Sequence, residues 1–120
     1  EPATGSDLKS LATTVTPHAQ GLLLNGEKSF ISNAGAAALY LALAREGDDF
    51  TLLLVPADLP GIEISPTPVI IAPHVLGEMK FSDVQLPTDA RLGKPGRGFD
   101  LVLATLAVFR ISVAGAAVGL

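Results

Sequence analysis

The sequence predicts a mainly β protein, an antiparallel sandwich or barrel followed by one apolar α-helix. Two observations carry this prediction. Between residues 11 and 87, short apolar runs alternate with turn residues at the spacing expected for antiparallel strands. Residues 99–120 then form one apolar stretch, which indicates a helix.

The strands are expected where the apolar runs lie. Prolines fall at the ends of these runs, as residues that lack a backbone donor should. Asn25-Gly26 is the strongest hairpin signal, because both residues tolerate the positive φ of a type I′ turn. The expected strands are residues 11–16, 21–24, 28–32, 39–44, 51–55, 62–64, 69–71 and 78–86.

The last part of the chain reads as a linker at residues 93–98 and a helix at 99–120. Asp100 stands near the helix N-terminus, where the helix dipole favours an acid. Arg110 is the only charge after Asp100, and a central Arg is costly in a membrane. We therefore expect a buried helix rather than a membrane span. Gly115 and Gly119 form a small-residue face that allows another helix to approach closely.

Composition indicates that this chain has partners or further parts. Hydrophobic residues make up 48% of the sequence and charged residues only 17%, against roughly 25% charged residues in an average soluble protein. Such an excess implies apolar surface that other chains, or other parts of the same polypeptide, cover. The chain also opens without a Met, so we expect its start to be a cut.

Charge and cysteine content exclude several kinds of site. The formal net charge is -4 and no long basic cluster occurs, which argues against nucleic-acid binding. Without cysteine there is no disulfide, thiol nucleophile or thiolate metal site, and a reducing cytoplasmic location is the default. His18 and His74 have no acidic or His partner at ligand spacing, so no metal site is expected.

Two polar stretches are the candidate functional segments, residues 1–7 and 25–35. The first is a turn whose Gly5 and Ser6 can present N–H and hydroxyl donors. In the second, strand alternation puts Phe30 and Ser32 on one face and Ile31 on the other. This pair suits a flat heteroaromatic ligand. The alternative is an ordinary turn and a strand with one buried aromatic residue. Glu27-Lys28 is expected on a solvated face.

At these residues the chain resembles the acyl-CoA dehydrogenase family, specifically its middle β-domain. Five motifs match in the family's order, and the resemblance runs through residues 1–120. The matching segments are Glu1-Pro2-Ala3-Thr4-Gly5-Ser6-Asp7, Asn25-Gly26-Glu27-Lys28-Ser29-Phe30-Ile31-Ser32-Asn33, Val55-Pro56-Ala57-Asp58-Leu59-Pro60-Gly61, Phe81-Ser82-Asp83-Val84-Gln85-Leu86-Pro87, and Leu92-Gly93 with Gly96-Arg97-Gly98-Phe99.

The resemblance implies part of an FAD-dependent oxidoreductase of fatty acid metabolism. Such a flavoprotein removes an α-proton from an acyl-CoA substrate while the β-hydrogen leaves as hydride to the flavin. It passes electrons to an electron-transfer flavoprotein or a similar acceptor and forms oligomers through its helices. Residues 1–92 would be the middle domain, 93–98 a linker, and 99–120 the first helix of a truncated C-terminal domain.

The resemblance also implies site residues. Gly5 and Ser6 would donate to the flavin ring or the thioester end of the substrate. Phe30, with Ile31 beside it, would cover a ring face. Ser32 would hydrogen-bond near flavin N5. Substrate-binding residues would be Ser6 and Arg110.

Three departures from the family pattern bear on catalysis. In the loop at residues 70–74, Ala72 and His74 replace an Arg and a Ser, which predicts weak CoA binding. Ala107 stands where the family usually has an Asp. Phe109 occupies the place of the catalytic Glu of some subfamilies, so no base is expected on this segment. The alternative is a non-catalytic, scaffolding subunit of the same fold with a decayed CoA site.

Overall fold

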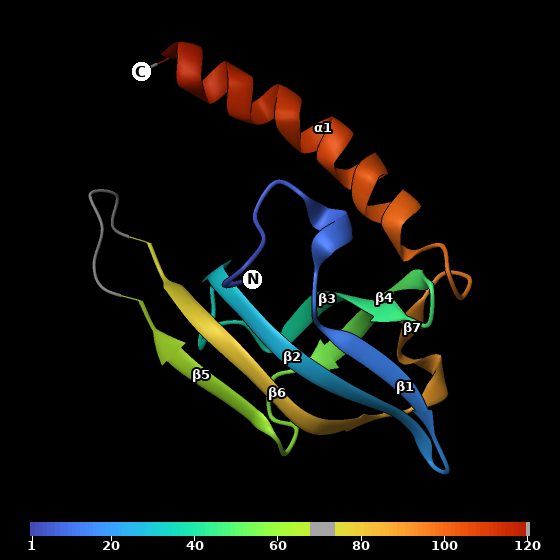
Figure 1. Cartoon of the computed structure of the whole chain (residues 1–120). Helices are drawn as coiled ribbons and strands as arrows, with labels where there is room; N and C mark the ends of the chain where they lie inside the picture. Colours follow the sequence, from blue (N-terminus) through green and yellow to red (C-terminus); the bar gives the residue numbers. More distant parts are fainter. Residues whose placement is uncertain (68–73, 120) are drawn as a thin grey trace.

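The computed structural model describes residues 1–67 and 74–119, and Figure 1 shows their arrangement. The chain forms a β-sheet and ends in one long helix. In chain order the elements are η1 (Leu8–Ser10), β1 (Thr14–His18), β2 (Gly21–Ser32), β3 (Leu39–Glu46), β4 (Asp49–Pro56), β5 (Ile62–Pro66), β6 (Leu76–Leu86), η2 (Thr88–Ala90), β7 (Arg91–Leu92) and α1 (Gly98–Gly119). The expected strand at residues 69–71 and position Ala72 lie outside the described residues.

The described strands form one mixed, open 7-stranded sheet in the order β5-β6-β2-β1-β3-β4-β7. Neighbouring strands are antiparallel except β1 and β3, which meet in parallel at Thr14 and Arg45. The expected antiparallel sandwich or barrel is therefore wrong. Within the described residues β5 pairs only with β6, and the two-residue β7 pairs only with β4. Each edge strand thus has a free side, and the sheet does not close.

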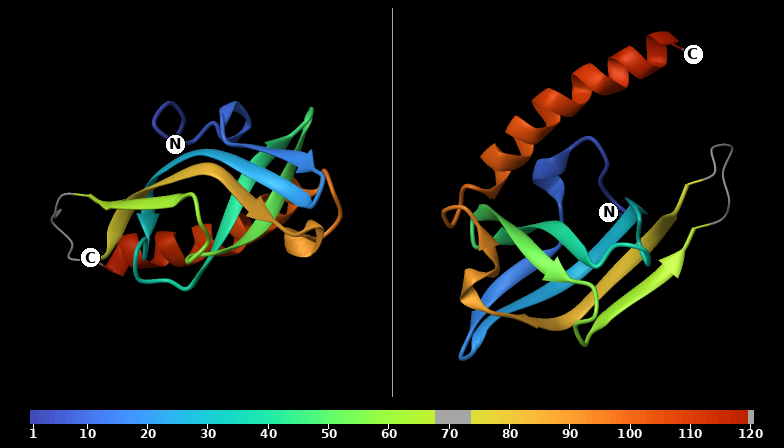
Figure 2. Two further views of the ribbon diagram at one scale, coloured as in Figure 1. Left: turned by 90° about the horizontal axis from the view of Figure 1, so that it is seen from below. Right: turned by 180° about the vertical axis from the view of Figure 1, so that it is seen from behind.

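One core nevertheless joins the two halves of the sheet, which curls on itself as Figure 2 shows. Alternate residues of five strands point into this core, as the period of a strand requires. Leu24, Leu53, Val55 and Val84 are fully buried there, and Tyr40 and Phe81 lie among them.

The predicted hairpin at Asn25-Gly26 is wrong. Residues 21–32 form the single strand β2, and its register with β6 shifts beside Asn25-Gly26, where β6 has one extra residue between Phe81 and Val84. The Asn25 side chain donates to Asp83 Oδ1 at 2.9 Å and accepts the Asp83 N–H at 2.8 Å. Gly26, with φ at 144°, lies so close to Thr13 that a Cβ would come within 2.5 Å of its hydroxyl. Glycine here therefore permits a close approach rather than a tight turn.

The hairpin between β1 and β2 lies earlier, where His18 pairs with Gly21 around Ala19 and Gln20. The expected first strand, 11–16, is displaced to Thr14–His18. The reason is that Thr13 bonds elsewhere. Its carbonyl accepts the N–H of Arg45 and its hydroxyl donates to the carbonyl of Glu27.

An ion pair fixes the segment that leads to the helix. Arg91 bonds through two nitrogens to the carboxylate of Glu46, and Thr51 donates to the same carboxylate at 2.6 Å. Arg91 lowers the pKa of Glu46, although burial opposes this. Gly98 then packs so closely on β4 that a Cβ would lie 2.3 Å from the Leu52 nitrogen. The start of α1 is thereby held against the end of the sheet.

Beyond its first turns α1 makes little contact with the described residues. Phe99 and Val102 pack on a small cluster with Phe50, and Figures 1 and 2 show the helix extending past the sheet. Apolar residues occupy all its faces, and Val108, Ile111 and Val118 are 71%, 76% and 90% exposed. The expected burial is therefore not provided by the described part of this chain. By length and composition alone α1 could also cross a membrane, with a mean hydropathy of 2.1.

Candidate functional site

The N-terminal turn is closed by the side chain of its first residue. The Glu1 carboxylate accepts the Ala12 N–H at 2.5 Å and the Thr13 N–H at 3.3 Å. Residues 1–13 thus form a loop whose two ends meet at one carboxylate. The loop carries Gly5 and Ser6, two of the residues expected in the site. Asp7 accepts the hydroxyl of Ser10, but its side chain makes no capping hydrogen bond to the backbone of η1.

Lys28 joins this loop to the sheet. Its Nζ atom donates to Glu1 at 2.6 Å and to the Leu43 carbonyl of β3 at 2.7 Å. The Lys28 and Glu1 side chains are only 14% and 6% exposed. The expectation that Lys28 lies on a solvated face is therefore wrong. Leu22, Leu24, Gly26 and Lys28 share the inward register of β2, and this alternation is the signal that could have placed it.

Burial and hydrogen bonding act on the two charges differently. Burial raises the pKa of the Glu1 carboxyl, but hydrogen bonds from Lys28, Ala12 and Thr13 outweigh it and lower the pKa to about 2. Burial also lowers the pKa of the Lys28 ammonium, and Glu1 only partly offsets this. The arrangement therefore favours the charged form of Glu1 but not that of Lys28. Burial costs the ammonium more hydration than its contacts with Glu1 offset.

Immediately after Lys28 the strand bulges. The register between β2 and β6 shifts between Lys28 and Ile31, and Phe30 takes a positive φ of 56°. This conformation is costly for a bulky residue, and such strain often occurs at functional sites. Phe30 is 70% exposed, whereas Ile31 packs against the core. The bulge thus presents a large flat side chain outward.

The loop and the bulge together line an open hollow of about 510 Å³. Gly5 and Phe30, far apart in sequence, meet at this hollow. Of the other expected cofactor-binding residues, Ser6 and Ser32 are exposed but do not line it, and Ile31 faces away into the sheet. The lining residues are Glu1, Pro2, Ala3, Thr4, Gly5, Ser29 and Phe30.

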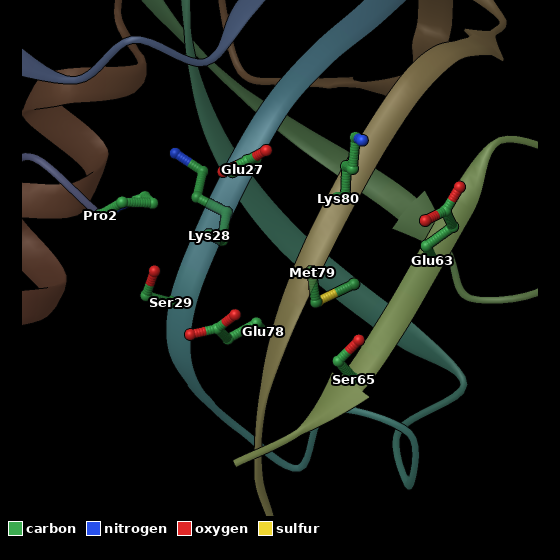
Figure 3. Close-up of a pocket in the computed structure, with 9 residues that line it drawn as sticks. All are labelled: Pro2, Glu27, Lys28, Ser29, Glu63, Ser65, Glu78, Met79 and Lys80. Atoms are coloured by element: carbon green, nitrogen blue, oxygen red, sulfur yellow. The ribbon is translucent and has the colours of Figure 1, made fainter.

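A smaller hollow of about 160 Å³ lies beside it, between the N-terminal segment and strands β2, β6 and β5 (Figure 3). Glu27, Lys80 and Glu63 are paired across these strands in one row. Lys28, drawn in Figure 3 with its ammonium directed toward the N-terminal segment, lines this hollow too. Charge alternates along the row, so it has no excess of cations for binding an anion.

Two other expectations concern residues away from the hollow. Arg110, the expected substrate-binding residue, is exposed on α1 together with Ala107 and Phe109. Among residues 1–67 and 74–119, no three His, Asp or Glu side chains are grouped so that they could hold a metal ion.

Comparison with known proteins decides the family. A family profile described as "Acyl-CoA dehydrogenase, middle domain" matches residues 1–84. The chain belongs to the acyl-CoA dehydrogenase family. An acyl-CoA dehydrogenase of Bacillus subtilis (strain 168) is 34% identical over 100% of this chain and 34% of its own length.

Solved acyl-CoA dehydrogenases share the fold. A probable acyl-CoA dehydrogenase from Mycobacterium abscessus superposes with a TM-score of 0.90 at 27% identity, over 95% of this chain and 32% of that one. A glutaryl-CoA dehydrogenase from Mycobacterium smegmatis, in complex with FADH2, has a TM-score of 0.73 at 28% identity, over 76% and 24%. This acyl-CoA dehydrogenase chain spans about a third of the length of the relatives it matches.

Proposed function

We propose that this chain forms the flavin-facing middle β-domain and the first C-terminal helix of an FAD-dependent acyl-CoA dehydrogenase. The observation that carries the proposal is the hollow in which the Gly5 turn and the Phe30 bulge meet. Its walls fit a flavin ring, since they combine an exposed aromatic face with the backbone of a polar turn. A similar solved structure holds FADH2.

Each of the expected site residues has a definite role in this proposal. Gly5 and Ser6 offer an N–H and a hydroxyl to the ring or to the thioester end of the substrate. Phe30 covers a ring face. Ser32 supplies a hydroxyl donor near flavin N5, and Arg110 binds the acyl-CoA substrate. When bound, the flavin would supply the redox chemistry by accepting hydride from the β-carbon of the substrate.

The rest of the protein would complete the site. The proposed catalytic base is a Glu outside these 120 residues, because Phe109 cannot accept a proton. The apolar faces of α1 would pack on further helices and on partner subunits. Electrons would leave to an electron-transfer flavoprotein or a similar acceptor. By the same reasoning, the 120-residue chain alone would be inactive.

The test is flavin binding by the full-length protein that contains this segment. Its purified form should show the visible absorption of bound flavin and should oxidise acyl-CoA thioesters. Phe30→Ala should weaken flavin binding. The control Leu39→Ala removes another exposed apolar side chain, 52% exposed, that does not line the hollow, and it should leave binding unchanged. A protein that takes up no flavin, even with excess FAD, would contradict the proposal.

A further inference from the structure

The two ends of the N-terminal loop, residues 1–13, are held together at a buried ion pair between Glu1 and Lys28. Glu1 gathers the N–H groups of Ala12 and Thr13, so the loop ends are tied to its carboxylate. Lys28 then ties that carboxylate to β2, on which Lys28 lies, and to the Leu43 carbonyl of β3. The pair therefore lies at the point where the two ends of the loop are attached to the sheet.

Lys28 is also next to the opposite wall of the hollow. The strand bulges directly after it, and Ser29 and Phe30 line the side that faces the loop. Glu1 itself lines the loop side. The ion pair therefore connects Glu1, on the loop wall, to the residue that directly precedes the opposite wall.

Stability alone does not account for a charged pair at this place. Removing two charges from water costs several kcal/mol per ion, and well-packed apolar residues often hold a fold equally well. Hydrogen bonds between charged groups are directional, however, and they fix a geometry more sharply than apolar contacts do. An ion pair is suited to setting a distance between two walls.

We infer that Glu1 and Lys28 are positioning residues, which set the separation between the Gly5 turn and the Phe30 bulge and so adjust the hollow to the flavin ring. This inference rests on the proposed function. Neither side chain needs to touch the flavin. Both act through the loop and the bulge that they hold.

The test compares two buried ion pairs in the full-length protein. Glu1→Gln keeps the shape of the side chain and removes its charge. Glu46→Gln does the same to the pair with Arg91, whose side chains are similarly buried, at 17% and 16% exposure for Arg91 and Glu46. Glu46 does not line the hollow. Lys28→Arg retains the charge and serves as the conservative variant.

Three readouts separate positioning from stability. They are the unfolding midpoint, the flavin dissociation constant with the visible circular dichroism of the bound flavin, and amide hydrogen exchange of residues 2–12 in the flavin-free protein. Both Gln variants should lower the midpoint. Only Glu1→Gln should speed exchange in the loop and weaken flavin binding, by about tenfold if one charged hydrogen bond is lost. Lys28→Arg should stay closer to the wild type in all three.

The outcomes distinguish the two proposals. If the wild type binds flavin and Glu1→Gln matches it in affinity, dichroism and loop exchange, the positioning inference is overturned and the proposed function stands. If Glu46→Gln weakens flavin binding as much as Glu1→Gln, the effect is general destabilisation, and the inference also fails. A wild-type protein without flavin overturns the proposed function itself. If Glu1→Gln does not fold, Lys28→Met provides the same comparison, because it removes the ammonium and leaves a side chain of similar length.

Discussion

The ring centroids of Phe50 and Phe99 lie 5.4 Å apart, with 39° between the ring planes. Phe50 lies at the start of β4 and Phe99 in the first turn of α1, so this pair links the sheet to the helix through side chains. Lys9 places its ammonium over the Phe99 ring, 5.5 Å from the centroid, and Arg45 places its guanidinium over the Phe50 ring, at 4.9 Å. The cluster therefore also joins η1 to the helix start.

We expect Phe99→Ala to release the first turns of α1. The cost should be about 2 kcal/mol, less than the 3 to 5 kcal/mol of a fully buried Phe, because Phe99 is only partly buried. Urea unfolding and limited proteolysis of the 120-residue chain would measure both effects. Phe109→Ala is the matched control, since Phe109 is 60% exposed on the same helix. Equal losses in the two variants would contradict this role of the aromatic pair.

The Glu1 carboxyl should make stability depend on pH in acid. Its pKa is about 2 in the fold and 4.5 in the unfolded chain. Because the folded value is lower, the carboxylate stabilises the fold above pH 4.5, and this contribution is lost as the pH falls toward 2. Its size is on the order of 3 kcal/mol. Unfolding free energies of wild type and Glu1→Gln, measured across this range, should converge at low pH. A constant difference would show that the carboxyl does not titrate in this way.

Glu46 should contribute in the same direction, since hydrogen bonding from Arg91 lowers its pKa despite burial. Glu1→Gln alone should therefore leave part of the acid sensitivity in place. The double variant with Glu46→Gln should remove more of it. A single variant that abolished the whole pH dependence would mean that only one of the two pairs matters.

Gly26→Ala should disrupt the attachment of the N-terminal loop. A Cβ at this position would lie 2.6 Å from the Cα atom of Thr13, and backbone cannot move aside as a flexible side chain can. We expect a cost of about 2 kcal/mol or more. Gly47→Ala is the control, because Gly47 also has a positive φ, of 62°, but meets nothing within 4 Å. It should cost only about 1 kcal/mol in backbone strain. Thermal unfolding of both variants would measure these two costs, and equal losses would contradict the role of the close contact with Thr13.

Ser32→Ala should slow reduction of the flavin in the full-length protein more than it weakens acyl-CoA binding. A hydroxyl near N5 would gain strength as charge develops there, and loss of one such donor typically costs about 10² to 10³ in rate. Stopped-flow reduction would measure this. Ser82→Ala removes another exposed serine from the sheet and should have no effect. Unchanged kinetics in Ser32→Ala would remove this residue from the site.

The 120-residue chain should self-associate through α1. Ile111 and Val118 are exposed, and among the described residues a Cβ added at Gly115 or Gly119 would meet no atom within 4 Å. A side chain that begins at Gly115 therefore starts in open space in the described part of the chain, and Gly115→Ile should weaken association by blocking close approach of a second helix. Sedimentation velocity would test this, with flavin titration alongside. A monodisperse wild-type monomer that binds flavin at micromolar concentration would show a self-sufficient domain.

The local pattern of this sequence determined its strands and its helix. Apolar alternation placed β3, β4, β5 and β6 close to where they lie, and the largely apolar stretch after Gly98 placed α1. These features depend on residues that are close together in the sequence, so they can be recognised from the sequence alone. The family motifs likewise follow the order of the chain, and the comparisons confirmed the family.

Tertiary structure alone decided how these pieces combine. Asn25-Gly26 has the local chemistry of a hairpin turn, yet Thr13 packs against Gly26 and Asp83 bonds to Asn25, so the strand continues past these two residues. Lys28 looks solvated beside Glu27, yet Glu1 compensates its charge from the far end of a loop. In each case the deciding partner is distant in sequence. Its contribution exists only after the chain has folded, and no local pattern contains it.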